Sequence, residues 1–234
     1  DRVSVKMWSN QSNCTGRATT LGRQANTPSI MDFLFILILP VLGLVALNKR
    51  EQRARIALLG SYLGRFRIEQ LMERLIQGYM RALGESDPER QAQVWQHLST
   101  DETELCLQFN AFVLEFSAVD AALARVSRWP FALPYATQWA AGHSFELRKA
   151  LSIHAHAINQ AASNSQHLSP KDKAFTLLAE LLLMQHTCHW FCRSKMVASA
   201  RLLARPPTAY AQVLSSVAAQ TRRADGTLTG SHAG

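Results

Sequence analysis

The sequence predicts an all-α protein in which a single N-terminal transmembrane helix precedes a cytoplasmic bundle of four to six helices. The run from Phe33 to Leu47 contains no charged and no hydrogen-bonding side chain. Further along the chain, apolar residues recur every three to five positions, which is the period of an amphipathic helix. No segment alternates apolar and polar residues in the way that half-buried strands do. These three observations together favour helices throughout.

Four segments are expected along the 234 residues. Residues 1–30 are polar and aperiodic, so they form a disordered leader or lie upstream of a translation start at Met31. Residues 31–47 form the transmembrane anchor, and residues 48–205 form the helical bundle domain. Residues 206–234 form a mostly disordered tail, because two prolines open it and Gly, Thr and Ser are frequent at its end.

The membrane anchor is short for a spanning helix. The 15 residues from Phe33 to Leu47 cover about 22 Å, whereas a hydrocarbon core is about 30 Å thick. Two other interpretations stay open, namely a cleaved secretory signal and a buried core helix of a soluble protein. The residues expected to contact lipid are Phe33, Leu34, Phe35, Ile36, Leu37, Ile38, Leu39, Val41, Leu42, Leu44, Val45 and Leu47.

A basic collar follows the anchor and consists of Lys49, Arg50, Arg53 and Arg55. An excess of Lys and Arg marks the cytoplasmic side of a membrane, so the residues from 48 onward are predicted to be cytoplasmic. The collar is expected to attract anionic lipid headgroups. Arg outnumbers Lys, which hints at a bacterial genome and hence at the bacterial inner membrane.

The first half of the bundle is predicted to contain three helices. The first runs from Asn48 to Leu83, continuous with the membrane run and ended by Gly84. The second starts after the capping residue Ser86 and ends near Leu98. The third begins at Ser99 or Thr100. Its apolar face comprises Leu105, Phe109, Phe112, Phe116, Val119 and Leu123, an aromatic stripe typical of a core.

The second half of the bundle is predicted to contain two more helices. The two prolines of Trp129–Tyr135 predict an apolar loop. Ser144 is expected to cap the next helix. The last long helix is expected to start at Pro170 and to end near Ala204, where Pro206 and Pro207 stop it.

One cluster of potential metal ligands occurs in the last long helix. Cys188 and Cys192 are one turn apart, and His189 lies about 100° around the helix from Cys188. Thiolate and imidazole are ligands that zinc and copper prefer, and His154 or Cys106 could complete a site for a metal or haem. The competing interpretation is that both cysteines are small core residues that extend the apolar face of the helix.

Catalytic motifs are absent from the sequence, which has no phosphate-binding glycine loop, no HExxH and no CxxCH. Glu180 is a carboxylate within an apolar stretch, so it should be exposed or paired with an Arg or His. These absences favour a non-enzymatic protein without settling the point, and no cofactor is expected apart from the metal or haem that the Cys188, His189 and Cys192 cluster could bind.

Three functions remain under consideration. The first is a membrane-anchored scaffold or docking module that binds a protein partner or a second copy of itself. The second is a metal- or haem-binding redox domain that uses the Cys188, His189 and Cys192 cluster. The third is a basic module that binds anionic lipid or nucleic acid, with nucleic acid disfavoured because no recognised binding motif accompanies the charge.

Overall fold

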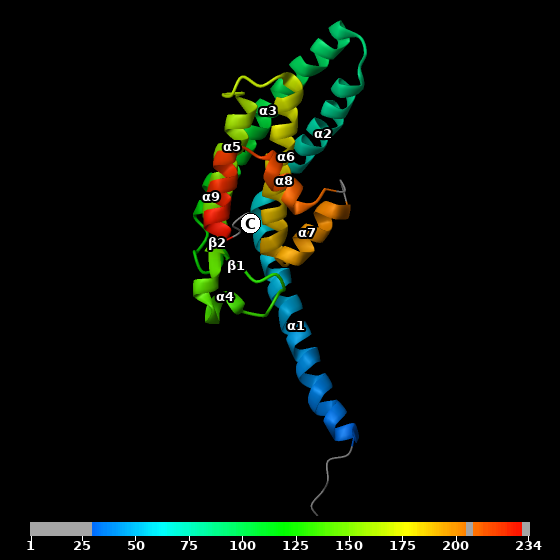
Figure 1. Cartoon of the computed structure of the whole chain (residues 1–234). Helices are drawn as coiled ribbons and strands as arrows, with labels where there is room; N and C mark the ends of the chain where they lie inside the picture. Colours follow the sequence, from blue (N-terminus) through cyan, green and yellow to red (C-terminus); the bar gives the residue numbers. More distant parts are fainter. Residues whose placement is uncertain (1–29, 205–207, 231–234) are drawn as a thin grey trace, which may run out of the picture. The chain divides into compact units, whose positions relative to one another are not determined.

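The computed structural model describes residues 30–204 and 208–230, with side chains from residue 36 onward. These residues form nine α-helices, one 3-10 turn and two short strands, which confirms the all-α class (Figure 1). The chain divides into two compact units, Asp1–Pro40 and Val41–Gly234. Within the first unit the described residues, 30–40, are helical. The predicted leader, except for Ile30, lies outside the described residues.

Helix α1 (Ile30–Leu63) confirms that the apolar run and the following segment belong to one continuous helix. In the part of the chain with described side chains, no helix has an apolar stretch long enough to cross a membrane. The expected anchor over residues 31–47 is therefore not supported by this part of the chain. Phe33, Leu34 and Phe35 lie outside the residues whose side chains are described.

The helix predicted over residues 48–83 is interrupted after Leu63. Tight turns follow, in which the amides of Arg65 and Phe66 donate to carbonyls three residues earlier. Helix α2 (Ile68–Gly84) then begins, and its buried face, which includes Leu71, Leu75 and Tyr79, packs against the next helix. The same spacing of apolar residues continues across the break, so periodicity alone did not reveal it.

Helix α3 (Pro88–Ser117) is a single helix where two were expected. Its N-cap is Asp87 rather than Ser86, and the Asp87 carboxylate accepts hydrogen bonds from the amides of Glu89 and Arg90. Ser99 does not cap a second helix, because its hydroxyl donates to the Gln96 carbonyl within α3. Serine hydroxyls satisfied in this way are compatible with a helix interior.

A two-stranded antiparallel sheet occupies the region between α3 and α5, where no strand was predicted. Strand β1 (Arg125–Ser127) pairs with β2 (Ser144–Glu146), and Val126 lies opposite Phe145. Each strand has three residues, too few to show an alternating pattern in the sequence. Helix α4 (Ala136–Trp139) and the 3-10 turn η1 (Ala141–His143) connect the two strands. Ser144 is thus a strand residue and not a helix cap.

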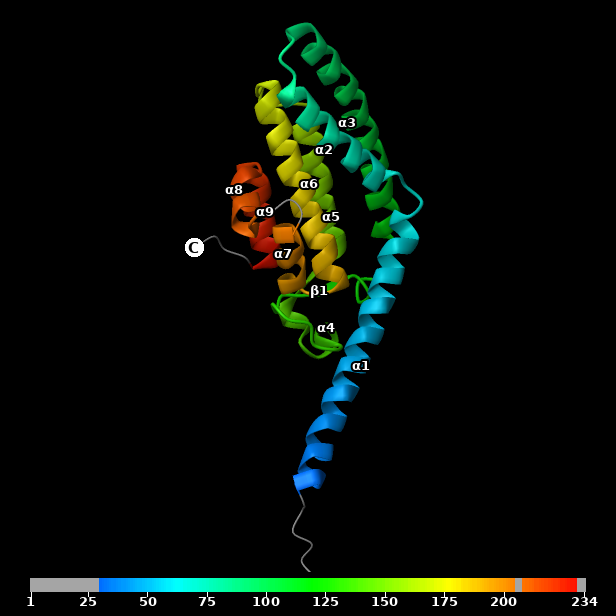
Figure 2. The same ribbon diagram turned by 90° about the vertical axis from the view of Figure 1, so that its right-hand side faces the viewer.

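Helices α5 (Leu147–Ala162) and α6 (Pro170–Cys192) lie side by side in the middle of the second unit (Figure 2). Helix α6 starts at Pro170 as predicted, and Ser169 caps it by accepting from the amide of Asp172. The predicted helix to Ala204 breaks at Arg193, and α7 (Lys195–Ala204) follows. The Ser194 hydroxyl accepts a hydrogen bond from the Val197 amide, which starts the new helix.

Helices α8 (Tyr210–Ser216) and α9 (Ala219–Thr229) occupy much of the segment predicted to be disordered. Val213 and Val217 pack against Leu183 of α6 and Leu202 of α7 in a small second core. Helix α9 packs against α5. Residues 210–216 and 219–229 are therefore helical where a disordered tail was predicted, and Val213 and Val217 are buried against the bundle.

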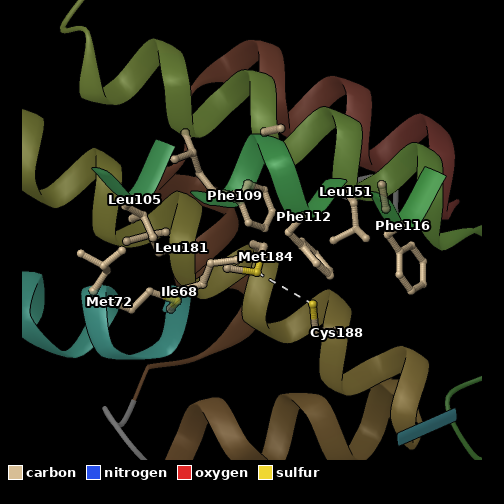
Figure 3. Close-up of a cluster of buried hydrophobic side chains, with 14 of the residues drawn as sticks. Ile68, Met72, Leu105, Phe109, Phe112, Phe116, Leu151, Leu181, Met184 and Cys188 are labelled. Atoms are coloured by element: carbon tan, nitrogen blue, oxygen red, sulfur yellow. Dashed lines mark hydrogen bonds between the residues drawn. The ribbon is translucent and has the colours of Figure 1, made fainter. Parts of the chain in front are cut away.

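The main core lies among α2, α3, α5 and α6 (Figure 3). The aromatic stripe predicted for α3 is confirmed at Phe109, Phe112 and Phe116, which are at most 1% exposed. Leu123 is the exception, because it follows the end of α3 and is exposed. Side chains that meet this stripe include Ile68 and Met72 of α2, Leu151 of α5, and Leu181, Met184 and Cys188 of α6.

Candidate functional site

A cavity of about 280 Å³ lies within the second unit, among α1, α2, α3, α6 and α7. Its volume is just below the range of about 300–1,000 Å³ that is usual for small-molecule sites. Apolar side chains form most of the wall, and Figure 3 shows several of them converging from α2, α3 and α6. The apolar lining residues are Ile56, Leu59, Leu63, Ile68, Met72, Phe112, Met184, Cys188 and Cys192.

Gly60 also lines the cavity, and it explains part of the open space. A Cβ atom added at Gly60 would meet no atom within 4 Å. The helix α1 therefore presents bare backbone to the cavity at this position. Glycine is a weak helix former, so it carries a cost in helix stability here without filling any volume.

The predicted ligand cluster forms part of this cavity. Cys188, His189 and Cys192 all line it, although the two cysteines lie on the apolar wall as packing residues. Burial raises the pKa of the Cys188 thiol to about 12 and that of Cys192 to about 11, so both are protonated at neutral pH. Neutral thiols are poor metal ligands.

His154 does not join the cluster, which corrects the predicted ligand set. Its Nε2 atom lies 2.9 Å from the Thr187 hydroxyl, and that hydroxyl donates to the Leu183 carbonyl. Nε2 must therefore carry the proton and donate to Thr187. Burial lowers the pKa of His154 to about 3, so the ring is neutral. Across the described ranges, no three His, Cys, Asp or Glu side chains are grouped to hold a metal ion.

The polar rim of the cavity is mainly basic. Arg193 and Arg201 are exposed there, and neither guanidinium forms an ion pair with any described residue. Arg193 donates to the Gln52 side chain at 2.6 Å. Arg201 donates to Nδ1 of His189 at 3.1 Å, and burial together with this arginine lowers the pKa of His189. Glu69 is the acidic residue on the rim.

The basic collar is smaller than predicted. Lys49, Arg50 and Arg53 are exposed and make no ion pair with any residue that the structure describes. Arg55 instead turns into the domain, where it pairs with Glu51 at 2.7 Å and donates to the Phe191 carbonyl. The Arg55 side chain is 16% exposed, so it does not share the exposed basic surface of the other three residues.

Exposed apolar side chains dominate the start of the described chain. In the first unit, the residues from Ile36 to Leu39 are 48–67% exposed. In the second unit, the large apolar residues from Val41 to Leu47 are 43–59% exposed. Soluble monomers rarely expose apolar surface of this extent, and such surfaces mark interaction sites with proteins or membranes.

Two buried carboxylates distinguish the second core. Glu180 is fully buried and accepts hydrogen bonds from the Ala218 amide at 3.0 Å and from the Thr221 hydroxyl. Burial raises the pKa of Glu180 to about 7 and that of Asp225 to about 6. The predicted Arg or His partner of Glu180 is thus replaced by the amide that precedes α9 and a hydroxyl.

A third buried carboxylate provides a contrast. Glu102 is paired with the Lys173 ammonium and also accepts a hydrogen bond from the Tyr79 hydroxyl at 2.5 Å. A buried carboxylate satisfied by a cation is a structural ion pair. Among the described residues Glu180 has no cationic partner of this kind, and its Oε2 atom is left without a hydrogen bond there.

Reasoning from the sequence missed the cavity and its rim. Arg193 follows Cys192 directly, but Arg201 lies beyond an unpredicted helix break, so the proximity of Arg201 to the cluster had no sequence signal. Gly60 could be recognised in the sequence as a glycine within a helical pattern, and such a glycine usually has a packing or functional reason. Comparison of the chain with models of protein families, with curated proteins and with solved structures gives no match.

Proposed function

We propose that this chain is a non-enzymatic membrane protein that docks a partner through its helical domain at the cytoplasmic face. The apolar run of α1 enters the bilayer, and the domain that follows lies at the membrane surface. The observation that carries this proposal is the exposure of the large apolar side chains from Ile36 to Leu47. The apolar run begins at Phe33, whereas side chains are described from Ile36 onward. The run is therefore three residues longer than the stretch with described side chains.

Charge supports the same arrangement. Lys49, Arg50 and Arg53 follow the apolar surface directly and are exposed. Each basic residue near an anionic membrane surface contributes about 1 kcal/mol of binding. The excess of basic residues on this side of the run favours a cytoplasmic location for the domain in the bacterial inner membrane.

The test of membrane insertion uses the full chain expressed in a bacterial host. We expect the protein to stay in the membrane fraction after extraction with alkaline carbonate. Leu39→Asp combined with Leu42→Asp should move it to the soluble fraction, because these positions flank the middle of the Phe33–Leu47 run and two carboxylates at a bilayer centre cost about 5–7 kcal/mol. The matched control is Leu114→Asp, since Leu114 is 74% exposed on α3. Release of the wild-type chain by carbonate would refute insertion.

The orientation and the collar are tested separately. A green fluorescent protein fused after residue 234 should fluoresce, and alkaline phosphatase at the same position should be inactive. An active phosphatase would show that the domain faces the periplasm. Lys49→Glu should weaken binding to vesicles with anionic lipid by about fivefold to thirtyfold, as expected for about 1–2 kcal/mol. Lys171→Glu, an exposed lysine at the start of α6, should leave it unchanged.

A further inference from the structure

We propose that the cavity beside Gly60 binds a single-chain anionic amphiphile, with its alkyl chain among the apolar wall residues and its carboxylate at Arg193 and Arg201. This inference goes beyond membrane docking, because it concerns a site within the helical domain. It requires neither the insertion of α1 nor a particular orientation in the membrane.

The wall of the cavity matches an alkyl chain. Its side chains are aliphatic, aromatic or sulfur-containing, and Met72 and Met184 are flexible residues that adapt to irregular ligands. A water molecule occupies about 30 Å³ in the liquid and a methylene group is of similar size. The cavity of about 280 Å³ therefore holds a chain of about eight to ten carbons.

The rim determines the charge of the ligand. Arg193 follows α6 and Arg201 belongs to α7, and both line the same cavity. Neither guanidinium forms an ion pair among residues 30–204 and 208–230. Guanidinium groups bind carboxylates with paired hydrogen bonds. With Glu69 included, the formal charge of the rim is positive, because two arginines face one glutamate and His189 is neutral.

A second observation places positive potential inside the opening. Arg193, Arg55 and Arg201 all act on the Cys192 thiol to lower its pKa, against the stronger effect of burial. Cys192 thus lies where the apolar wall meets the basic rim. A bound amphiphile would cover this thiol at the junction between its chain and its carboxylate.

Cys192 and Cys106 provide a matched pair of reporters. Both thiols are half-buried, and burial raises the pKa of each to about 11. Of the two, Cys192 lines the cavity and Cys106 does not. Their intrinsic reactivities are therefore comparable, and a ligand in the cavity should protect one and not the other.

The experiment measures the alkylation rate of each thiol by N-ethylmaleimide in the full chain, reconstituted in nanodiscs of zwitterionic lipid and analysed by peptide mass spectrometry. Saturating decanoate should slow the reaction of Cys192 at least about tenfold and leave that of Cys106 unchanged. Decanol should protect more weakly, and decyltrimethylammonium should not protect. Equal protection by decanol, or equal slowing of both thiols, would overturn the proposal.

Gly60→Phe tests the location of the chain. The new side chain enters open space on the cavity wall and replaces a weak helix former, so the fold should be retained. Decanoate should then give no protection of Cys192 relative to the unliganded variant. Gly84→Phe is the control, because Gly84 also borders open space but does not line the cavity. Undiminished protection in Gly60→Phe would place the ligand elsewhere and overturn the proposal.

Discussion

Replacement of Glu180 by glutamine should remove a pH dependence from the stability of the domain. The pKa of Glu180 in the folded protein is raised from 4.5 to about 7 because the carboxylate is buried without a cation. The folded protein therefore holds a proton that the unfolded chain releases between pH 4.5 and 7. Stability from this group is fully present below pH 4.5 and is lost as the pH rises to about 7.

The magnitude follows from the size of the shift. A difference of about 2.5 pKa units corresponds to about 3 kcal/mol of unfolding free energy across this interval. The glutamine side chain in Glu180→Gln would stay neutral and would still accept the hydrogen bond from the Ala218 amide. Its new amide group has no acceptor at the position of the unpartnered oxygen, which gives a cost that does not vary with pH.

Urea unfolding of the full chain, followed by tryptophan fluorescence from about pH 4.5 to about pH 8 in a nonionic detergent, measures the effect. The difference in unfolding free energy between wild type and Glu180→Gln should shift by about 3 kcal/mol in favour of the variant as the pH rises. Glu115→Gln, at an exposed carboxylate, should follow the wild-type curve. Parallel curves for wild type and Glu180→Gln would refute the reasoning.

Three further substitutions test the packing and the helix ends by the same urea unfolding. Phe116→Ala should cost about 3–5 kcal/mol because the ring is fully buried, whereas Leu114→Ala, at a side chain 74% exposed, should change stability by less than about 0.5 kcal/mol. Asp87→Ala should cost about 1 kcal/mol through loss of the α3 cap, and Ser99→Ala, which caps nothing, should cost almost nothing. Arg55→Ala should cost about 2 kcal/mol, because the Arg55 hydrogen bonds join α1 to the end of α6. An unchanged midpoint of urea unfolding would show that these hydrogen bonds do not stabilise the domain and would favour the predicted contact of Arg55 with lipid.

The helices of this protein were predictable where a single local signal acted. The Phe109, Phe112 and Phe116 stripe identified the core face of α3, and Pro170 identified the start of α6. Helix breaks were missed where apolar spacing continued across them, as between Leu63 and Ile68. The break at Arg193 depends on a serine, a residue that also occurs in helix interiors, so the sequence alone did not distinguish the two roles.

The candidate site was predictable only in part, because its residues come from five segments of the chain. Cys188, His189 and Cys192 were identified as a cluster, but the chemistry assigned to them depends on what surrounds them. Burial keeps the thiols protonated, and the Arg201 guanidinium donates a hydrogen bond to the His189 ring. A pattern within one helix cannot indicate which neighbouring helix supplies the charge.

Helices α8 and α9 affect the order in which the protein can complete its fold during synthesis. The face of α6 that carries Leu183 and Glu180 is covered by segments that are translated after it. At about 5–20 residues per second, the ribosome needs about 2–8 s to extend the chain from Cys192 to Gly230. During this interval the nascent chain exposes an apolar face with a carboxylate at its centre. A chaperone that binds such faces would therefore encounter this protein before α9 is synthesised.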